Sequence, residues 1–189
     1  AVCQGDSIAL FVVETNGSDT LNLVIQDQGG GVVFSDPAYV SGDSIKILPP
    51  PGVTTTYSIQ SVTDAVLPSC TVTDNTPGGG PSVVVNLNPA ITTQPLDVVI
   101  CHNTDTAFVV ETVTGVTYEW QTDSASGGAT WHVLANGSGI SGVTNDTLRV
   151  LARDALNGFS FRVRVIDNGT TCDSISDPGL LTVNPLPVI

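Results

Sequence analysis

The pentapeptide Phe11-Val-Val-Glu-Thr15 recurs unchanged at Phe108-Val-Val-Glu-Thr112. The two copies follow Cys3 and Cys101 by eight and seven residues, respectively. Alternating large apolar residues in such a short run are typical of a β-strand with one buried face. The repetition predicts that the same strand of the same fold occurs twice in this chain.

The alternation also predicts which side chains of this strand are buried. We expect the core positions to be Phe11, Val13, Phe108 and Val110, and the solvent-facing ones to be Glu14 and Glu111.

The cysteines extend the repeat over the whole chain. Cys3 and Cys101 lie 98 residues apart, Cys70 and Cys172 lie 102 apart, and both halves end on Val-Asn, followed closely by proline. The sequence therefore predicts two tandem units, 1–89 and 90–189. We expect the joint, 86–95, to be semi-rigid because it contains two prolines.

Within each unit, short β-rich runs alternate with turn residues. The expected strands are 7–15, 21–26, 31–34, 44–48, 54–62, 82–86, 98–100, 106–112, 116–122, 130–134, 146–151, 159–166 and 180–183. About seven short strands per hundred residues is the signature of a β-sandwich. The predicted fold class is all-β: two tandem immunoglobulin-like antiparallel β-sandwich domains.

Charge excludes several classes of partner. The 189-residue chain has a formal net charge of −13 and only five lysines and arginines. Nucleic acids and anionic membrane surfaces would be repelled, and no apolar run is long enough for direct membrane insertion. The absence of methionine favours a mature or excised fragment. These features suit a secreted, extracellular protein.

Cysteine spacing predicts one disulfide within each unit. The pairs Cys3–Cys70 and Cys101–Cys172 span 67 and 71 residues, and their closure implies an oxidising compartment. A metal site is the alternative, but the Cys101-His102 pair is not repeated, because Gln4 follows Cys3.

No group of residues forms a catalytic motif. His102 and His132 have no nucleophile motif beside them, and Glu111 and Glu119 occupy ordinary strand positions. The triple glycines at 29–31 and 78–80 lack the lysine of a phosphate-binding loop. We predict a non-enzyme with no catalytic residues, no metal ligands and no cofactor. Calcium stays open as a minor alternative, with oxygen ligands available in the turns at 64, 74–75 and 167–169.

Several phrases resemble a known repeat type. They are 90–101 (AITTQPLDVVIC), 118–121 (YEWQ), 148–150 (LRV), 157–162 (NGFSFR) and, in the first unit, 49–64 and Cys70. These phrases resemble the Ig-like and PKD-like repeats of secreted Bacteroidota surface proteins, including the type IX-secreted gliding-motility adhesins (SprB-like repeats). In this resemblance Trp120 is the sandwich tryptophan, Val110 and Val163 replace the inter-sheet cysteines, and Phe161 replaces the corner tyrosine.

A second signal recurs seven times as Asp, then Ser or Thr, then an aliphatic residue. It resembles the O-glycosylation signal of exported Bacteroidota proteins, and the implied carriers are Ser7, Thr20, Ser44, Thr106, Ser124, Thr147 and Ser174. A structural alternative stays open, because Asp and Ser/Thr close turns and an aliphatic residue starts the next strand. The Asn-X-Ser/Thr matches at 16, 136, 145 and 168 are interpreted as turn composition.

The resemblance implies stalk or filament repeats of a secreted bacterial cell-surface adhesin. The expected partners are neighbouring repeats of the same chain, and an external surface or glycan reached through other parts of the parent protein. The alternative is a carbohydrate-binding or spacer module of a secreted glycan-degrading enzyme, with Trp131 and Tyr118 as aromatic candidates. A third hypothesis is a self-assembling S-layer or sheath component.

Overall fold

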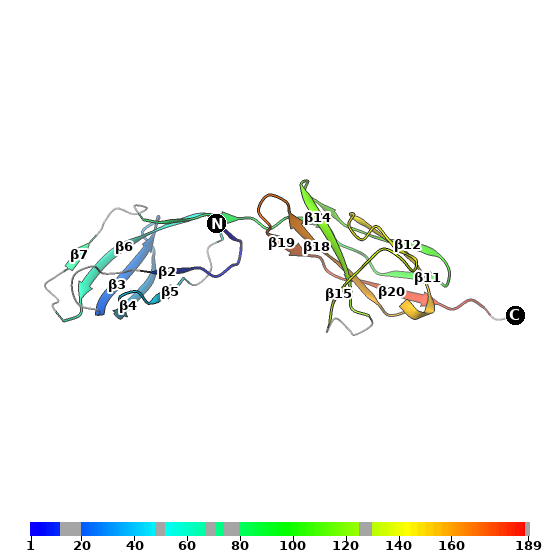
Figure 1. Ribbon diagram of the computed structural model, residues 1–189, viewed down its shortest axis with the longest axis horizontal. Coiled ribbons are helices and arrows are strands. Elements are labelled where there is room, and N and C mark those ends of the chain that lie inside the picture. The colour runs from blue at the N-terminus through cyan, green and yellow to red at the C-terminus, as the bar shows by residue number, and fades with distance from the viewer. Residues whose placement is uncertain (12–19, 48–51, 67–70, 74–79, 125–129, 188–189) are drawn as a thin grey trace. The chain divides into compact units, whose positions relative to one another are not determined.

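The computed structural model describes residues 1–11, 20–47, 52–66, 71–73, 80–124 and 130–187. The architecture is all-β and Ig-like, with sheets that are antiparallel apart from one repeated pair. The chain divides into two units, Ala1–Leu87 and Asn88–Ile189, and each has its own hydrophobic core. The units are described separately below (Figure 1).

Unit 1 is built around the sheet β4-β3-β6-β7, with β8 also paired to β6 and with two smaller pairs, β2–β5 and β1–β9. Its strands are β1 Val2–Cys3, β2 Ala9–Phe11, β3 Thr20–Asp27, β4 Val32–Val40, β5 Ser44–Lys46, β6 Thr55–Asp64, β7 Thr71–Thr73, β8 Ser82–Val83 and β9 Val85–Asn86.

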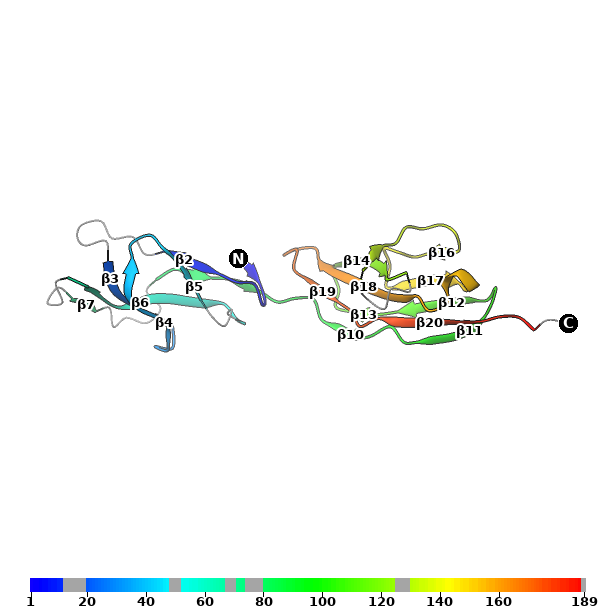
Figure 2. The ribbon, with the colours of Figure 1, turned by 90° about the horizontal axis from the view of Figure 1, so that it is seen from below.

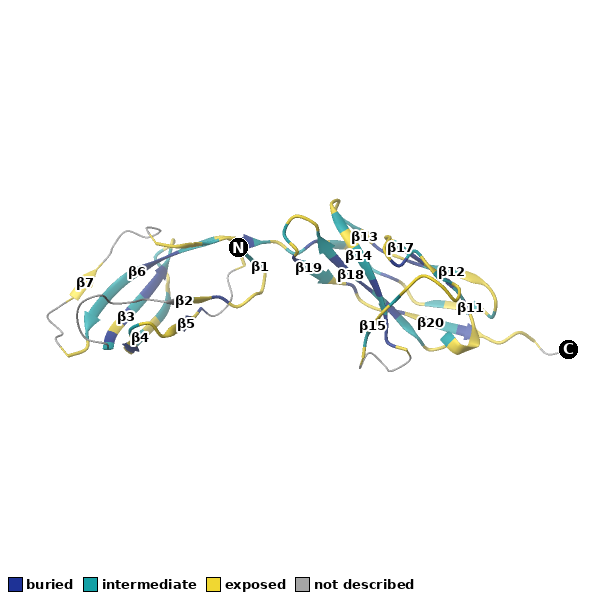
Figure 3. Ribbon diagram, viewed as in Figure 1, coloured by how far each residue is buried: buried dark blue, intermediate teal, exposed yellow. Residues whose placement is uncertain are grey.

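The alternation of β3 organises the core of unit 1. Leu21, Leu23 and Ile25 are buried at every second position, because successive side chains of a strand point to opposite faces. Ile45 of β5 and Tyr57 of β6 belong to the same cluster. β3 therefore lies at the centre of this unit; in Figure 3 it carries the dark blue of buried residues, and β6 beside it is mainly teal.

Strand β4 carries a proline that the sheet accommodates at its edge. Leu23 pairs with Asp36 and Leu21 with Tyr39, so Pro37 and Ala38 sit in a bulge. The Ala38 amide donates to Asp36 Oδ1 at 2.8 Å, which satisfies a donor that the bulge removes from the ladder. A proline is tolerated here because β4 has only one strand neighbour.

Unit 2 forms two main sheets and a small pair. The larger sheet has the order β11-β20-β18-β14-β15, with β19 also paired to β18; the second is β12-β17-β16, and β10 pairs with β13. Its elements are β10 Ile91–Thr93, β11 Val98–Cys101, β12 Asp105–Val109, β13 Glu111–Thr112, β14 Val116–Thr122, β15 His132–Val133, β16 Ile140–Ser141, β17 Thr147–Leu151, the 3₁₀ helix η1 Asp154–Leu156, β18 Ser160–Asp167, β19 Asp173–Ile175 and β20 Gly179–Asn184.

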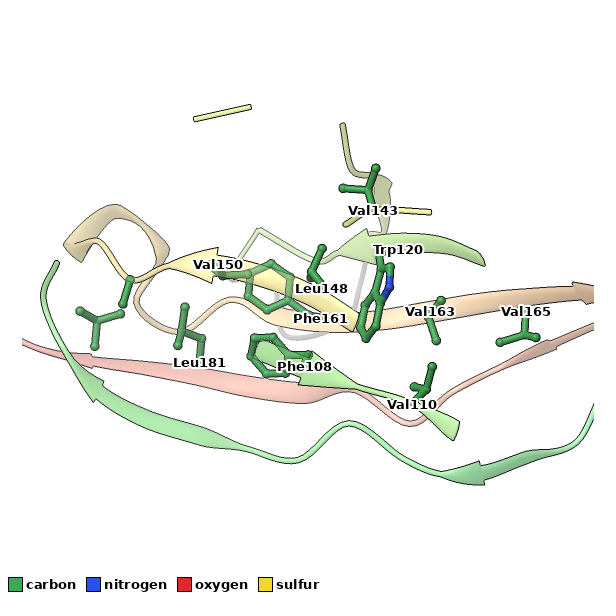
Figure 4. Close-up of a cluster of buried hydrophobic side chains, with 12 residues drawn as sticks. Phe108, Val110, Trp120, Val143, Leu148, Val150, Phe161, Val163, Val165 and Leu181 are labelled. Atoms are coloured by element: carbon green, nitrogen blue, oxygen red, sulfur yellow. The ribbon is translucent and has the colours of Figure 1, made fainter. Parts of the chain in front are cut away.

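The core of unit 2 lies between these two sheets (Figure 4). Trp120 of β14 is fully buried, and its indole Nε1 donates to the Asn145 carbonyl oxygen at 2.8 Å. The rings of Phe108 and Phe161 lie with centroids 4.9 Å apart. Val163 is fully buried in the same cluster, so the positions that the resemblance gave to replaced cysteines and tyrosine are apolar core positions.

The repeated pentapeptide behaves as predicted where it is described. Phe108 and Val110 are each 1% exposed, and Glu111 is exposed. Val13 and Glu14 lie outside the described residues, and of Phe11 only the backbone is described, as the end of β2.

Candidate functional site

Both units contain one parallel strand pair, and it carries a cysteine in each. In unit 1, β1 pairs with β9 so that Val2 faces Val85 and Cys3 faces Asn86. In unit 2, β11 pairs with β20 along Val98–Cys101, and Cys101 faces Asn184 (Figure 2).

The hydrogen bonds just beyond these cysteines are also repeated. The Gln4 amide donates to the Asn86 carbonyl at 2.9 Å, and the His102 amide donates to the Asn184 carbonyl at 2.9 Å. Cys3 and Cys101 are therefore equivalent residues at the same end of their units, next to the end of the last strand.

The cysteines differ in covalent state. Cys3 and Cys172 are each disulfide-bonded. Cys101 is a free and exposed thiol, whereas Cys172 is completely buried. The predicted bridge between Cys101 and Cys172 is therefore wrong.

Strand register explains why this bridge cannot form. The Cys172 carbonyl accepts from the Asp167 amide at 2.9 Å, at the end of β18, while Phe161 near the start of β18 pairs with Gly179. From Asp167 six residue steps lead along β18 to Phe161, and five more lead along β20 to Asn184, in the same direction. Eleven strand steps correspond to about 35 Å, and a disulfide needs Cα atoms within about 7 Å.

Unit 1 follows the same plan as far as it is described. Cys70 lies outside the described residues, but Thr71 pairs with Thr63 at the end of β6, and Thr55 at its start pairs with Val83. Thr71 therefore lies at the opposite end of unit 1 from Cys3.

The histidines and glutamates considered for catalysis do not converge. His102 Nδ1 lies 2.8 Å from Asp154 Oδ1 and ties the turn after β11 to η1, and His132 lies exposed on β15. Glu111 Oε2 accepts from the Thr93 hydroxyl at 2.7 Å, and Glu119 Oε1 accepts from Gln121 Nε2 at 3.0 Å. The two glutamates belong to different sheets, and each is held by a neighbouring side chain.

No cluster of three or more His, Cys, Asp or Glu that could hold a metal ion occurs in the described part of the chain. The oxygens of the turn at 167–169, a calcium candidate, are engaged instead in hydrogen bonds within the turn. Asp167 Oδ1 accepts from the Thr170 hydroxyl at 2.9 Å and from the amides of Thr170 and Gly169 at 2.7 and 2.9 Å. These bonds, led by the Thr170 hydroxyl, lower the pKa of Asp167. Asp64 is similar, since its Oδ1 accepts from the Val66 amide, and 74–75 lie outside the described residues.

Trp131, the aromatic candidate for sugar binding, is half-buried. The Arg162 guanidinium carbon lies 3.9 Å from the centroid of its ring, and Arg162 Nε donates to Gln121 Oε1 at 2.9 Å. Burial lowers the pKa of Arg162, in keeping with its packing on the indole. One face of the ring is thus covered by a cation held in place by a second side chain. Tyr118 donates to or accepts from the Thr112 hydroxyl at 2.7 Å.

The seven glycosylation candidates gather at strand boundaries. Five lie at the first or second position of a strand, Ser7 lies two residues before β2, and Ser124 lies two residues after β14. The aliphatic residue that follows is buried in four of them, Ile8, Leu21, Ile45 and Leu148. None of the seven hydroxyl-bearing residues is buried: Ser7, Ser44 and Ser124 are exposed, and Thr20, Thr106, Thr147 and Ser174 are half-buried.

Asp123 shows that the acidic member of the pattern can have a structural role. It is 1% exposed, and its Oδ1 accepts from the Ser160 amide at 2.8 Å. Thr106 has different surroundings, because it lines a recess of about 460 Å³ together with Asp105, Ala107, Gly139, Ser141 and Arg149. The Asp-Ser/Thr-aliphatic pattern is therefore compatible with both hypotheses: it can mark the start of a strand, and it can mark an accessible modification site.

The described residues include no helix with the length and hydrophobicity needed to cross a membrane. No protein family model matches the chain, and no curated protein matches it either.

Solved Ig-domain structures do match. The tandem Ig repeats of Dlar match at 13% identity with a TM-score of 0.44, covering 98% of this chain and 92% of that one. A chimeric titin Z1Z2-Z1Z2 tandem matches at 18% identity with a TM-score of 0.42, covering 97% and 93%. Titin M4 matches at 19% identity with a TM-score of 0.40, covering 51% and 95%. By the sheets and the two cores described above, this chain has an all-β, Ig-like β-sandwich fold in two tandem units.

Proposed function

We propose that this chain is a pair of structural repeats in the stalk of a secreted bacterial cell-surface adhesin. The single observation that carries the proposal is that both units repeat one structural arrangement. The same parallel strand pair, with the same Cys–Asn register and the same closing hydrogen bond, occurs at the end of both units. Domains that repeat in tandem, with the same strand arrangement at the end of each, are suited to act as spacers of fixed length along a fibre.

Surface chemistry is consistent with an extracellular role. The net charge of −13 keeps neighbouring acidic fibres apart, and disulfide-bonded cysteines belong to oxidising compartments. The link to type IX secretion and gliding motility rests on the sequence resemblance alone. The seven hydroxyl residues are proposed glycan carriers, because none of them is buried.

The experiment is antibody labelling of the bacterium that encodes this chain. Antibodies raised against residues 1–189 should label intact cells, and the labelling should disappear after protease treatment of the cell surface. Deletion of the coding segment, with the flanking sequence joined in frame, removes the epitopes of these antibodies. A tag placed elsewhere in the parent protein should then show a fibre that is shorter but still present on the cell surface. Labelling confined to the interior of lysed cells would contradict the proposal.

Carbohydrate binding is the second candidate, and Trp131 is the residue that would carry it. Residues 1–189 are applied to a glycan array beside the variant Trp131→Ala. A stalk repeat gives no binding with either protein. Binding that is lost in Trp131→Ala and kept in a control such as Val133→Ala, on the neighbouring strand, would favour the carbohydrate-binding module instead.

A further inference from the structure

We propose that Cys101 is a linkage residue, which forms a disulfide with a cysteine of a further Ig-like unit that lies outside residues 1–189. The bond would start from Cys101, at the end of β11 in unit 2. Its partner would be the cysteine of the further unit that is equivalent to Cys172 of this unit. This inference goes beyond the proposed stalk function and does not depend on which surface protein contains the chain.

The first argument is internal equivalence. Cys3 and Cys101 face equivalent asparagines in equivalent parallel pairs, and the next residue makes the same backbone hydrogen bond in each unit. Cys3 is disulfide-bonded, so this structural position is one that forms a bridge. Cys101 occupies the same position with a free, exposed thiol.

The second argument is that unit 2 cannot supply the partner itself. Its other cysteine, Cys172, is already disulfide-bonded and lies about 35 Å away along β18 and β20. A partner for Cys101 must therefore come from another polypeptide segment.

The third argument concerns which segment fits. Cys172 shows the second kind of cysteine position in this repeat type, in the turn between β18 and β19, and it too is bridged. A further unit of the same kind carries both kinds of position, one at each end. A bridge between a Cys101 position in one unit and a Cys172 position in the next can be repeated along a row of units. A bridge between two Cys101 positions joins only two units and cannot be repeated in this way.

The oxidation balances with a protein disulfide as the oxidant. The Cys101 thiolate attacks one sulfur of the oxidant, and a mixed disulfide forms while the other sulfur leaves as a thiolate. The partner cysteine, as thiolate, then attacks the Cys101 sulfur and releases the oxidant as a dithiol. Two thiols are oxidised to one disulfide, and the oxidant takes up two electrons and two protons.

The test extends the natural chain by one unit. Val183-Asn184 corresponds to Val85-Asn86, so by the 98-residue period Ile189 corresponds to Ile91. Residues 1–189 are therefore followed directly by a second copy of residues 92–189. The protein is secreted into an oxidising compartment, alkylated without reduction and mapped by mass spectrometry of its peptides.

We expect Cys101 to be alkylated almost completely in residues 1–189 alone. In the extended chain it should be found mainly in one cross-linked peptide, with the Cys172 of the appended copy. The matched control carries Cys172→Ser in the appended copy only and should return Cys101 to the alkylated form, while far-UV circular dichroism and tryptophan fluorescence check folding of all variants.

Three results would overturn the inference. These are full alkylation of Cys101 in a folded extended chain, a bridge from Cys101 to the Cys172 of its own unit, and cross-linking mainly between Cys101 residues of two molecules. If the appended copy fails to fold, the extension is repeated with Cys101→Ser in the appended copy. Persistent alkylation of the remaining Cys101 then counts against the inference as well.

Discussion

The Asp167 side chain illustrates how one residue fixes a turn. Its Oδ1 accepts three hydrogen bonds from the two residues Gly169 and Thr170. An acceptor with no donor hydrogen suits this position, because a carboxylate can satisfy several donors at once. The turn that it closes leads directly to the buried Cys172, which places that sulfur at the end of β18.

The lowered pKa of Asp167 gives this turn a pH dependence with a defined sign. Because the folded pKa lies below the ordinary 3.8, the unfolded chain binds more protons in the window between the two values. The contribution to stability is complete above pH 3.8 and is lost as pH falls through the folded pKa. Asp167→Asn should therefore be less stable than wild type near neutral pH, and this difference in stability should shrink as the pH falls through the folded pKa.

Thermal melts of both proteins between neutral and strongly acidic pH measure this difference. The control is Asp177→Asn, since Asp177 is an exposed carboxylate of the same unit. A difference between wild type and Asp167→Asn that stays constant over the whole pH range would contradict the role given to this side chain.

The Phe108–Phe161 pair offers a second test at the residue scale. Both rings are buried and in contact, so Phe108→Ala and Phe161→Ala should each lower the free energy of unfolding by about 3–5 kcal/mol. The double variant should cost less than the sum of the two, with a coupling of about 0.5–1.5 kcal/mol. Urea unfolding followed by tryptophan fluorescence measures all three. Val109→Ala, at a position 44% exposed, is the control and should change stability little.

At the scale of elements, the turn from β16 to β17 depends on a glycine. Gly142 has φ +80°, and a Cβ placed on it would lie 2.3 Å from the Thr147 carbonyl oxygen. The Gly142 carbonyl also accepts from the Asn145 amide at 2.9 Å. The close approach of Gly142 to Thr147 keeps β17 in register with β16. In this register the Asn145 carbonyl accepts a hydrogen bond from the Trp120 indole.

Gly142→Ala should therefore be more destabilising than the same change at Gly115. Gly115 has nearly the same φ, +79°, but no atom within 4 Å of its Cβ position, so Gly115→Ala carries only the backbone cost of about 1–2 kcal/mol. The close contact should add about 2 kcal/mol at Gly142. Chemical unfolding of both variants measures the difference, and equal destabilisation would show that the contact relaxes without cost.

Strand identity was predictable from the sequence where alternation is strong. The runs that became β3, β14, β17 and β18 alternate over five or more residues, and their buried positions follow from that alternation. Short strands such as β10 and β19 have three residues each, and their existence depends on a partner strand rather than on their own pattern. β4 was predicted too short, because Pro37 marks a strand end unless the strand is at an edge.

The cysteine pairing was not predictable for a related reason. Two cysteines 71 residues apart can lie at the same end or at opposite ends of a sandwich, and the spacing alone does not distinguish these cases. The register of β18 against β20 decides it, and that register is a long-range property. One sequence signal was available: both halves place one cysteine before the copy of the repeated pentapeptide and another after their longest strand, β6 or β18, so each unit repeats two unlike positions.

At the scale of the whole molecule, the two units have separate cores. Leu23 is fully buried in unit 1 and Leu148 in unit 2, and the two belong to different clusters. Both tryptophans, Trp120 and Trp131, lie in unit 2, so tryptophan fluorescence reports the unfolding of that unit.

We expect Leu148→Ala to lower the stability measured by tryptophan fluorescence by about 2–5 kcal/mol, and Leu23→Ala to leave it nearly unchanged. Both variants should lose circular dichroism signal earlier than wild type. The measurements are made in reducing buffer, so that no disulfide contributes. A large shift of the fluorescence midpoint in Leu23→Ala would mean that the units unfold as one cooperative body.

The parallel pairing of β11 with β20 has a mechanical consequence. The chain enters β11 at Val98 and leaves β20 at Asn184, and the register Val98↔Leu181 to Cys101↔Asn184 places these points at opposite ends of one ladder. Tension that reaches Val98 and Asn184 therefore slides these two strands past each other in shear. All rungs of the ladder share the force and must break together, whereas a hairpin pulled at its open end unzips one rung at a time.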